Sequence, residues 1–299
     1  MHHIFLEAAG CITTGYLIKS VHQAGYRAIA ADMDAQVAAR LLADEFFALP
    51  RAGSEKFWER VYYHLQDTKV DIVFPSLHET LLEWSERSDE LRRMGIHTII
   101  SDPQTIRTCQ DKWLTYQHFM NNGIPVPDTS LSQSHRLVKP RFGRGGKGIV
   151  MTDDAVSMEG MISQQFVEGQ EYTVDVFCDK HCNPVYIIPR KRMQVKDGKS
   201  TAGIVVNHAK IIEWAKKICA GLPFIGPVNL QCIETPDEEI KFIEINPRVA
   251  GGMALGFAAS ENWISLAIEH FVHNQPIEPK PVIWGLKMMR YYEEVFTVD

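Results

Sequence analysis

A polar strand end in the last third of the chain carries side chains suited to binding a metal ion. Residues 240–245 read as a strand, and Glu244 and Asn246 lie two residues apart, so their side chains point the same way. If residues 228–233 pair with this strand as a hairpin, Gln231 projects beside them. Mg²⁺ takes carboxylate and amide oxygens and completes its shell with phosphates. Because a carboxylate is costly to bury unpaired, the pattern favours a metal site over a polar strand end closed by an Asn-Pro turn.

Cationic residues next to glycines predict a phosphate-binding site. Lys139 ends a predicted strand, and the following residues 141–148 hold four glycines and three more cations. Since glycine has no Cβ, backbone N–H groups there can approach a triphosphate, and Lys139 adds positive charge. No G-K-[ST] follows, so this is not a Walker A loop, and a flexible hairpin is the alternative. Arg248 is placed to contact a phosphate or a developing acyl-phosphate charge.

Three weaker patterns concern the rest of a binding site. Residues 163–175 read as a linker that passes into a strand whose Glu171 could hold ribose hydroxyls, although a hairpin with a charged outer face also fits. Residues 189–193 carry three cations ahead of a mobile loop at 198–203, and these cations could hold an anionic substrate or be solvated. The turn Gly251-Gly252-Met253 exposes backbone that could face a substrate.

The first third of the chain is expected to form an α/β unit. Strands are predicted at residues 4–9, 27–31, 70–75 and 96–101, with helices at 16–24, from a Ser54 cap to 66, and up to about 94. Strands alternating with helices predict a parallel sheet. The carboxyl ends of its strands would carry Asp32, Ser76, His78 and Glu79, either as ligand contacts or as ordinary loop residues. The turn 10–15 lacks G-x-G-x-x-G, which argues against a Rossmann oxidoreductase.

The remainder of the chain changes to a mixture typical of an α+β lobe. A helix over 111–122 ends at Gly123, a suitable C′ residue. Strands are predicted at 137–140, 148–151, 172–178, 184–189, 228–233 and 240–245, and helices at about 208–220 and 261–273.

The composition is that of a globular protein, with 45% hydrophobic and 23% charged residues in 299. The net charge of −6 argues weakly against a nucleic-acid coat. We expect no membrane span and no secretion signal, and the six scattered cysteines indicate reduced thiols in the cytoplasm. Cys178 and Cys182 flank a short polar segment, which favours a hairpin tip over a structural zinc site, since no second cluster would complete the four ligands.

These blocks, in this order, resemble the ATP-grasp superfamily, most closely the carbamoyl phosphate synthase large-subunit type and its short stand-alone ligases. The resemblance runs from Ile4 to about Ala267. It implies an α/β protein in which an N-terminal parallel-sheet pre-ATP-grasp domain over residues 1–108 precedes an α+β ATP-grasp domain over 109–299. A small lid lobe would lie at about 113–166, reduced because the chain there is short.

The resemblance also implies a role for individual residues. The ATP contacts of the family correspond here to Lys112, Lys139, Gly143, Gly145, Gly146, Gln164, Phe166 and Glu171. The two lysines flank the phosphates, the glycines form a mobile loop, Gln164 and Phe166 contact the adenine, and Glu171 holds the ribose. Ligands of magnesium (or Mn²⁺) correspond to Gln231, Glu244 and Asn246. Gln231 stands where many relatives have an acid, which implies weaker binding of one metal ion. Arg248, with Lys139, would act catalytically on the transferred phosphoryl group.

The implied activity is an ATP- and magnesium-dependent ligation of a carboxylate to an amine or thiol through an acyl phosphate, giving ADP and phosphate. The partners would be small-molecule carboxylates and amines, with no nucleic acid or membrane, and a homodimer is compatible with the family. Carbamoyl phosphate synthesis itself is not expected, because there is no second synthetase half. Two alternatives stay open: a non-catalytic or regulatory ATP-binding protein, and a phosphotransferase that uses the same site.

Overall fold

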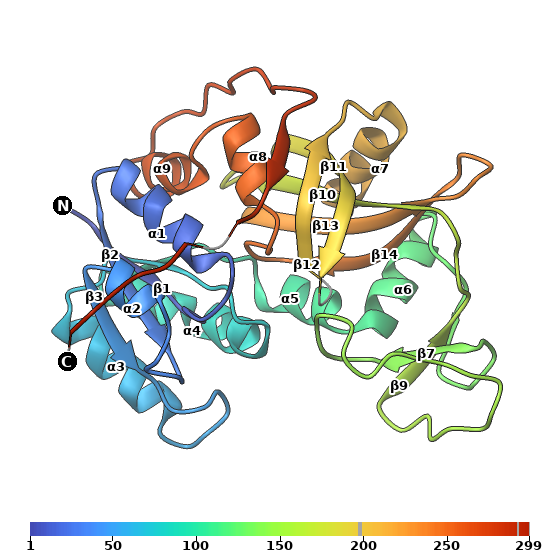
Figure 1. The fold of residues 1–299 in the computed structure, drawn as a ribbon, viewed down its shortest axis with the longest axis horizontal. Coiled ribbons are helices and arrows are strands. Elements are labelled where there is room, and N and C mark those ends of the chain that lie inside the picture. Colours follow the sequence, from blue (N-terminus) through green and yellow to red (C-terminus); the bar gives the residue numbers. More distant parts are fainter. Residues whose placement is uncertain (197–198, 292, 299) are drawn as a thin grey trace.

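The chain folds around three β-sheets, which Figure 1 shows side by side. The computed structural model describes residues 1–196, 199–291 and 293–298, with side chains omitted at 195–200. Within those ranges, the helices are all too short or too polar to cross a membrane.

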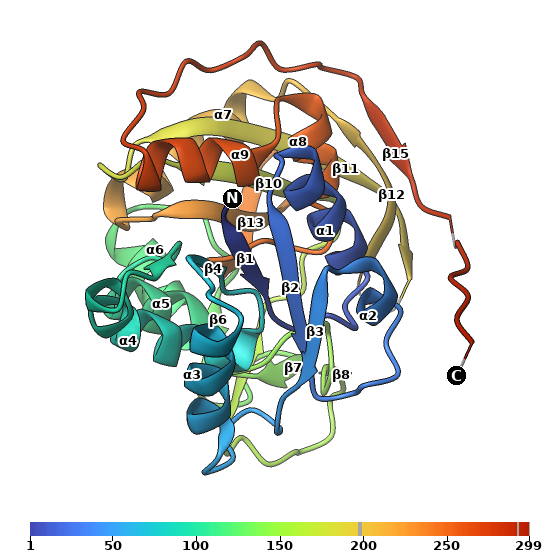
Figure 2. The ribbon, with the colours of Figure 1, turned by 90° about the vertical axis from the view of Figure 1, so that its left-hand side faces the viewer.

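The N-terminal unit is a five-stranded parallel sheet covered by helices (Figure 2). Its elements are β1 (His3–Leu6), α1 (Thr14–Gln23), β2 (Arg27–Asp32), α2 (Ala39–Leu42), β3 (Glu45–Ala48), α3 (Phe57–Asp67), β4 (Ile72–Phe74), η1 (His78–Thr80), α4 (Leu81–Arg93), β5 (His97–Thr98) and α5 (Pro103–Gln110). The strand order is β3-β2-β1-β4-β5, and every pair is parallel. The predicted α/β architecture is therefore confirmed, and all the strand carboxyl ends meet at one edge.

A six-stranded antiparallel sheet forms the centre of the second unit. Its elements are β10 (Gln170–Cys178), β11 (Pro184–Lys196), β12 (Lys199–Val205), α7 (Ala209–Gly221), β13 (Gly226–Glu234), β14 (Ile240–Asn246), α8 (Ala254–Ala259), α9 (Trp263–Ala267), η2 (Ile268–Val272) and β15 (Lys287–Met289). The order is β14-β13-β10-β11-β12-β15. Val174, Val176 and Ile211 share one buried cluster, so α7 covers the apolar face, while Thr173 and Asp175 point to the opposite face. The C-terminal segment arches back to β12 (Figure 2).

A small four-stranded sheet, in the order β6-β9-β7-β8, lies beside the large one. Its strands are β6 (Thr129–Ser130), β7 (Leu137–Pro140), β8 (Val150–Met151) and β9 (Met161–Gln164), and helix α6 (Lys112–Asn121) precedes them in the chain. The Asp111 side chain caps α6 by accepting bonds from Trp113 N and Leu114 N. Gly123 follows α6 with φ of 63°, as its predicted position requires. The small sheet falls within the range predicted for a lid lobe.

Several local predictions are wrong. The segment at 163–164, predicted as linker, ends strand β9, because it pairs with β6 and β7. The predicted mobile loop at 198–203 is strand β12 from Lys199 on, paired with β11, while Gly198 lies outside the described residues. The last predicted helix is broken into α9 and a π-helical turn, η2. Ser54 does not cap α3, whose N-cap position is Lys56, without a side-chain bond.

Candidate active site

The polar face of the large sheet aligns side chains from four strands in one row. Glu244 of β14 pairs with Gln231 of β13, which pairs with Thr173 of β10, which pairs with Arg190 of β11. The register shifts between Gln231 and Cys232, because Ile243 is an extra residue in β14. Such a bulge lets consecutive side chains reach one site, and here Ile243 and Glu244 both face the same pocket.

The first of two pockets at this row has the groups needed for a nucleotide. Lys112, Lys139 and Glu171 line it together with Gln231 and Glu244. The glycine-rich loop completes its wall through Gly143, Arg144, Gly145, Gly146 and Lys147. Eight of the eleven predicted ATP and metal residues therefore line one pocket: Lys112, Lys139, Gly143, Gly145, Gly146, Glu171, Gln231 and Glu244. Gln164, Phe166 and Asn246 do not line it.

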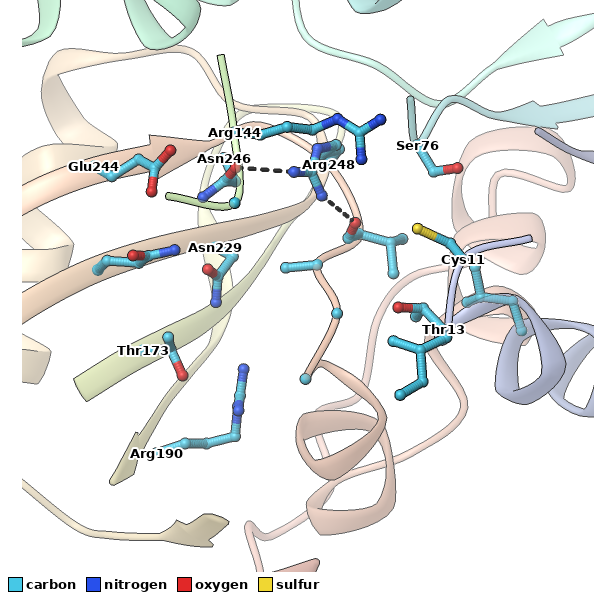
Figure 3. Close-up of a pocket in the computed structure, with 18 of the residues that line it drawn as sticks. Cys11, Thr13, Ser76, Arg144, Thr173, Arg190, Asn229, Glu244, Asn246 and Arg248 are labelled. Atoms are coloured by element: carbon cyan, nitrogen blue, oxygen red, sulfur yellow. Dashed lines mark hydrogen bonds between the residues drawn. The ribbon is translucent and has the colours of Figure 1, made fainter. Parts of the chain in front are cut away.

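The second pocket lies between the two units, and all four residues of the row line it (Figure 3). The N-terminal unit contributes residues 11–14 and Ser76 at the ends of β1 and β4. The large sheet contributes Thr173, Arg190, Asn229, Asn246 and Arg248, and the turn 249–252 closes the pocket. The sequence analysis singled out Ser76, Arg190, Arg248 and the glycine turn separately but missed Thr173 and Asn229, because only the strand register reveals that they share a site.

The two pockets share the residues at which they meet. Arg144, Gly145, Arg192, Gln231 and Glu244 line both of them. A ligand in the first pocket that extends past Glu244 would therefore reach a ligand in the second. This is the geometry that group transfer between two bound molecules requires.

Lys139 is buried and held in place by the small sheet. Its exposed fraction is 8%, and its Nζ donates to Gln164 Oε1 at 2.7 Å. The Gln164 Nε2 donates in turn to Thr129 Oγ1 at 2.9 Å. Gln164 therefore orients the lysine in this structure, and its predicted contact with the adenine, expected partly through backbone, stays a prediction. Phe166 is 57% exposed and borders a separate hollow with Gln133, so the structure does not bring it to the other predicted residues.

The glycine-rich loop is tied to both units. Lys112 Nζ donates to Gly143 O at 2.9 Å, and Arg144 pairs with Glu79 of η1 at 3.3 Å. Exposed ion pairs of this kind contribute less than about 1 kcal/mol, so the loop can leave this position easily. Gly148, at φ 75°, allows the return of the loop, because a Cβ there would lie 2.9 Å from Pro140 Cγ.

Arg248 projects beside the metal-binding pattern, as Figure 3 shows. Its Nη1 donates to Val249 O and its Nη2 to Asn246 Oδ1, both at 3.0 Å. Its Nε is buried and has no hydrogen-bond partner among the described residues. Burial lowers the pKa of Arg248, and the guanidinium still carries its charge at neutral pH.

The oxygen donors fit a hard cation only if phosphates supply further ligands. Among the described residues, no three His, Cys, Asp or Glu side chains cluster to hold a metal on their own. The Glu244 side chain makes no ion pair or hydrogen bond with the described residues, and Gln231 lies opposite it on β13. Asn246 Oδ1 already accepts from Arg248. One unpaired carboxylate beside an amide matches Mg²⁺, which typically uses one or two carboxylates plus substrate phosphates.

The residues predicted at the carboxyl ends of the parallel strands make different contacts, and only some of them lie at the candidate site. Asp32 accepts from Gly10 N at 2.8 Å and from Asp34 N at 3.0 Å, so it closes the local loops. Burial, with Arg248 nearby, lowers the pKa of His78 to about 4, so this imidazole is neutral at pH 7. Glu79 pairs with the glycine-rich loop, and Ser76 lines the second pocket.

We expect nucleotide affinity to weaken as pH rises above 8 because of Lys139. Burial, with Lys112 nearby and Glu244 opposing, lowers the pKa of Lys139 to about 8. The protonated amine attracts phosphate, so loss of the proton should raise the Kd of Mg-ADP by about tenfold between pH 7 and pH 9. Calorimetry across this range tests the expectation. Lys139→Met should bind more weakly and lose the pH step. A wild-type step that persists in the variant would assign it to another group.

Two family models match this chain. Residues 109–252 match an ATP-grasp domain, and residues 8–99 match a PylC-like N-terminal domain. The first match contains the glycine-rich loop, Glu244 and Arg248, and the second contains the parallel sheet up to β5.

Solved structures share the fold at low sequence identity. Biotin carboxylase from Campylobacter jejuni, in a beta-gamma-ATP complex, superposes with a TM-score of 0.74 at 15% identity, over 95% of this chain and 73% of that one. N5-carboxyaminoimidazole synthetase from Staphylococcus aureus, complexed with ADP, gives 0.72 at 16% identity, over 97% and 82%. Rhizobium etli pyruvate carboxylase gives 0.70 at 16% identity over 87% of this chain, which spans only 27% of that enzyme.

Proposed function

Because the chain belongs to the ATP-grasp superfamily, with a PylC-like N-terminal domain ahead of its ATP-grasp domain, we propose that it is an ATP- and magnesium-dependent ligase that joins a carboxylate to an amine or thiol. The observation that carries this proposal is the meeting of the two pockets at Gln231 and Glu244. A protein that only bound ATP would not need a second polar pocket beside the phosphates.

The reaction has two steps. A carboxylate oxygen of the substrate attacks the γ-phosphorus of ATP, and the bond to the β-phosphate oxygen breaks, giving an acyl phosphate and ADP. The acceptor nitrogen or sulfur then attacks the acyl carbon, phosphate leaves with the electron pair of the C–O bond, and the acceptor loses its proton. Neither step needs a covalent intermediate on the protein.

The residues of the chain act by position and charge. Lys112 and Lys139 would neutralise the phosphates in the first pocket, and Gln231 with Glu244 would hold Mg²⁺ there. Magnesium, when bound, offsets negative charge on the phosphates during transfer. Arg248 would donate to the transferred phosphoryl oxygens from the second pocket. The loop 143–147 covers the junction and would exclude water from the acyl phosphate.

A phosphate-release assay with product analysis tests the proposed function. Purified protein and Mg-ATP are incubated with pools of carboxylates, each with and without pools of amines and thiols. We expect release that depends on one carboxylate–acceptor pair, together with a new amide or thioester detected by mass spectrometry. Phosphorylation of one substrate without that bond would indicate a phosphotransferase. Tight nucleotide binding with no stimulated release would indicate a non-catalytic ATP-binding protein.

A further inference from the structure

The second pocket has one end that the transfer reaction does not use. Glu244 and Arg248 lie at the end that meets the nucleotide pocket, whereas Arg190 and Thr173 line the second pocket alone. Figure 3 shows Arg190 pointing into this pocket from the side away from Arg248. Along the row of paired residues, Arg190 is three strands from Glu244, which corresponds to about 14 Å between backbones.

Arg190 is fixed so that one of its nitrogens has no partner. The side chain is 1% exposed, and its Nε and Nη2 donate to the two oxygens of Asp175, the latter at 2.8 Å. Asn229 Nδ2 also donates to Asp175 Oδ1 at 2.9 Å. Nη1 is buried and finds no acceptor among the described residues. Buried donors are almost always paired, so this nitrogen points to a ligand acceptor.

Two further buried polar atoms near this end, on Thr173 and Arg290, also have no hydrogen-bond partner among the described residues. The Thr173 hydroxyl, 6% exposed for the residue, has no hydrogen-bond partner in the described part of the chain. Arg290 donates to Gly251 O and to Ile12 O while its buried Nε is also unpartnered. Unlike Arg190, neither Arg248 nor Arg290 forms an ion pair with a described carboxylate. The charge around the turn 251–252 is therefore positive.

The glycine turn leaves room for the Arg190 guanidinium at this end. A Cβ on Gly252 would lie 2.6 Å from Arg190 Nη1, so a side chain there would displace the guanidinium. The absence of a side chain lets the planar guanidinium lie against the turn, and Arg190 and Gly252 line the pocket together. Such an edge, with a hydroxyl beside it, is suited to a carboxylate or phosphate.

We propose that this end is a binding subsite for a second anionic group of the substrate, separate from the carboxylate that is activated at Arg248. The inference rests on the proposed function, and it names the substrate class: a molecule with one reacting carboxylate and a further carboxylate or phosphate. Arg190 Nη1 and Thr173 Oγ1 donate to that group, while Asp175 and Asn229 position the guanidinium.

Calorimetry with two matched pairs of small acids tests this subsite. The pairs are glutarate with butyrate, and 3-phosphoglycerate with glycerate, so each pair differs by one anionic group. Titrations contain saturating Mg-ADP, which keeps the acids out of the phosphate-binding pocket. We expect the dianion of at least one pair to bind about tenfold more tightly than its monoanion. A larger preference for glutarate identifies a carboxylate subsite, and one for 3-phosphoglycerate identifies a phosphate subsite.

Substitutions at Thr173 and Arg190 test whether the second anionic group binds at these residues. Thr173→Val, which keeps shape and removes the hydroxyl, should weaken the dianion by about five- to tenfold and leave the monoanion unchanged. Thr98→Val is the matched control, because Thr98 Oγ1 is another buried, unpartnered hydroxyl but lies on β5, outside both pockets. Arg190→Lys should abolish the preference if the variant folds.

Three outcomes would overturn the subsite: equal binding within both pairs, no binding of any of the four acids, or equal effects of the two threonine variants. A failure of Mg-ADP to bind would instead count against the proposed function. The subsite would then be judged by the comparison of Thr173→Val with Thr98→Val, since Thr173 does not line the nucleotide pocket in which the acids could also bind.

Discussion

Glu244→Gln is expected to lower ATP-dependent phosphate release by about 100-fold or more while leaving the fold intact. Among the residues that the structure describes, Glu244 is the one carboxylate that lines both pockets, so it can offer a negative oxygen to a cation between them. Because it has no hydrogen bond or ion pair with the described residues, its replacement by an amide breaks no contact in the protein. The free energy of unfolding should therefore change by less than about 0.5 kcal/mol.

The metal dependence of ADP binding gives the sharper measurement. In the wild type, Mg²⁺ should strengthen ADP binding, because Glu244 then shares the ion with the phosphates. In Glu244→Gln that enhancement should vanish, and metal-free ADP should bind at least as well as before, since the Glu244 carboxylate no longer offsets the positive charges of Lys112 and Lys139. Glu239→Gln, in the exposed turn before β14, is the control. A variant that kept both its rate and its magnesium enhancement would exclude Glu244 as a metal ligand.

The parts of the fold that the sequence predicted well are those with strong local signals. The helix from Lys112 to Asn121 has an aspartate cap at one end and Gly123 at the other, and the structure ends it at these residues. The buried strands β2, β10 and β14 are continuous apolar or alternating runs. In contrast, β12 contains Gly203 and polar residues, and it is a strand because β11 and β15 pair with it on its two sides.

The site residues also divide into those that residue type and spacing identify and those that depend on strand pairing. Lys139, the glycines and Glu244 could be singled out because residue type and spacing alone indicate their chemistry. That Lys139 is held by Gln164 could not be predicted, since it depends on how β7 pairs with β9. The bulge at Ile243 and the row from Glu244 to Arg190 likewise follow from strand register, which a single sequence specifies only weakly.

Arg248→Lys is expected to separate catalysis from nucleotide binding. Arg248 lines the second pocket and not the nucleotide pocket, so the Kd of Mg-ADP should stay within about threefold of the wild type. Lysine keeps the charge but cannot hold Val249 O and Asn246 Oδ1 while it presents a further donor to the phosphoryl oxygens. Loss of one such preorganised donor lowers kcat by about 100- to 1,000-fold.

The test measures two quantities for the wild type and Arg248→Lys: the single-turnover rate of phosphate release, and the Kd of Mg-ADP by calorimetry. Lys139→Met is its counterpart, because it removes a cation from the nucleotide pocket and should weaken binding as well as rate. If Arg248→Lys instead weakened ADP binding by the same factor as the rate, Arg248 would act on the bound nucleotide rather than on the group in transfer. The division of labour between the two pockets would then be wrong, since a residue of the second pocket would be shown to hold the ligand of the first. If only the rate falls, the charge that Arg248 offsets develops after both substrates are bound, as an acyl phosphate formed between the pockets requires.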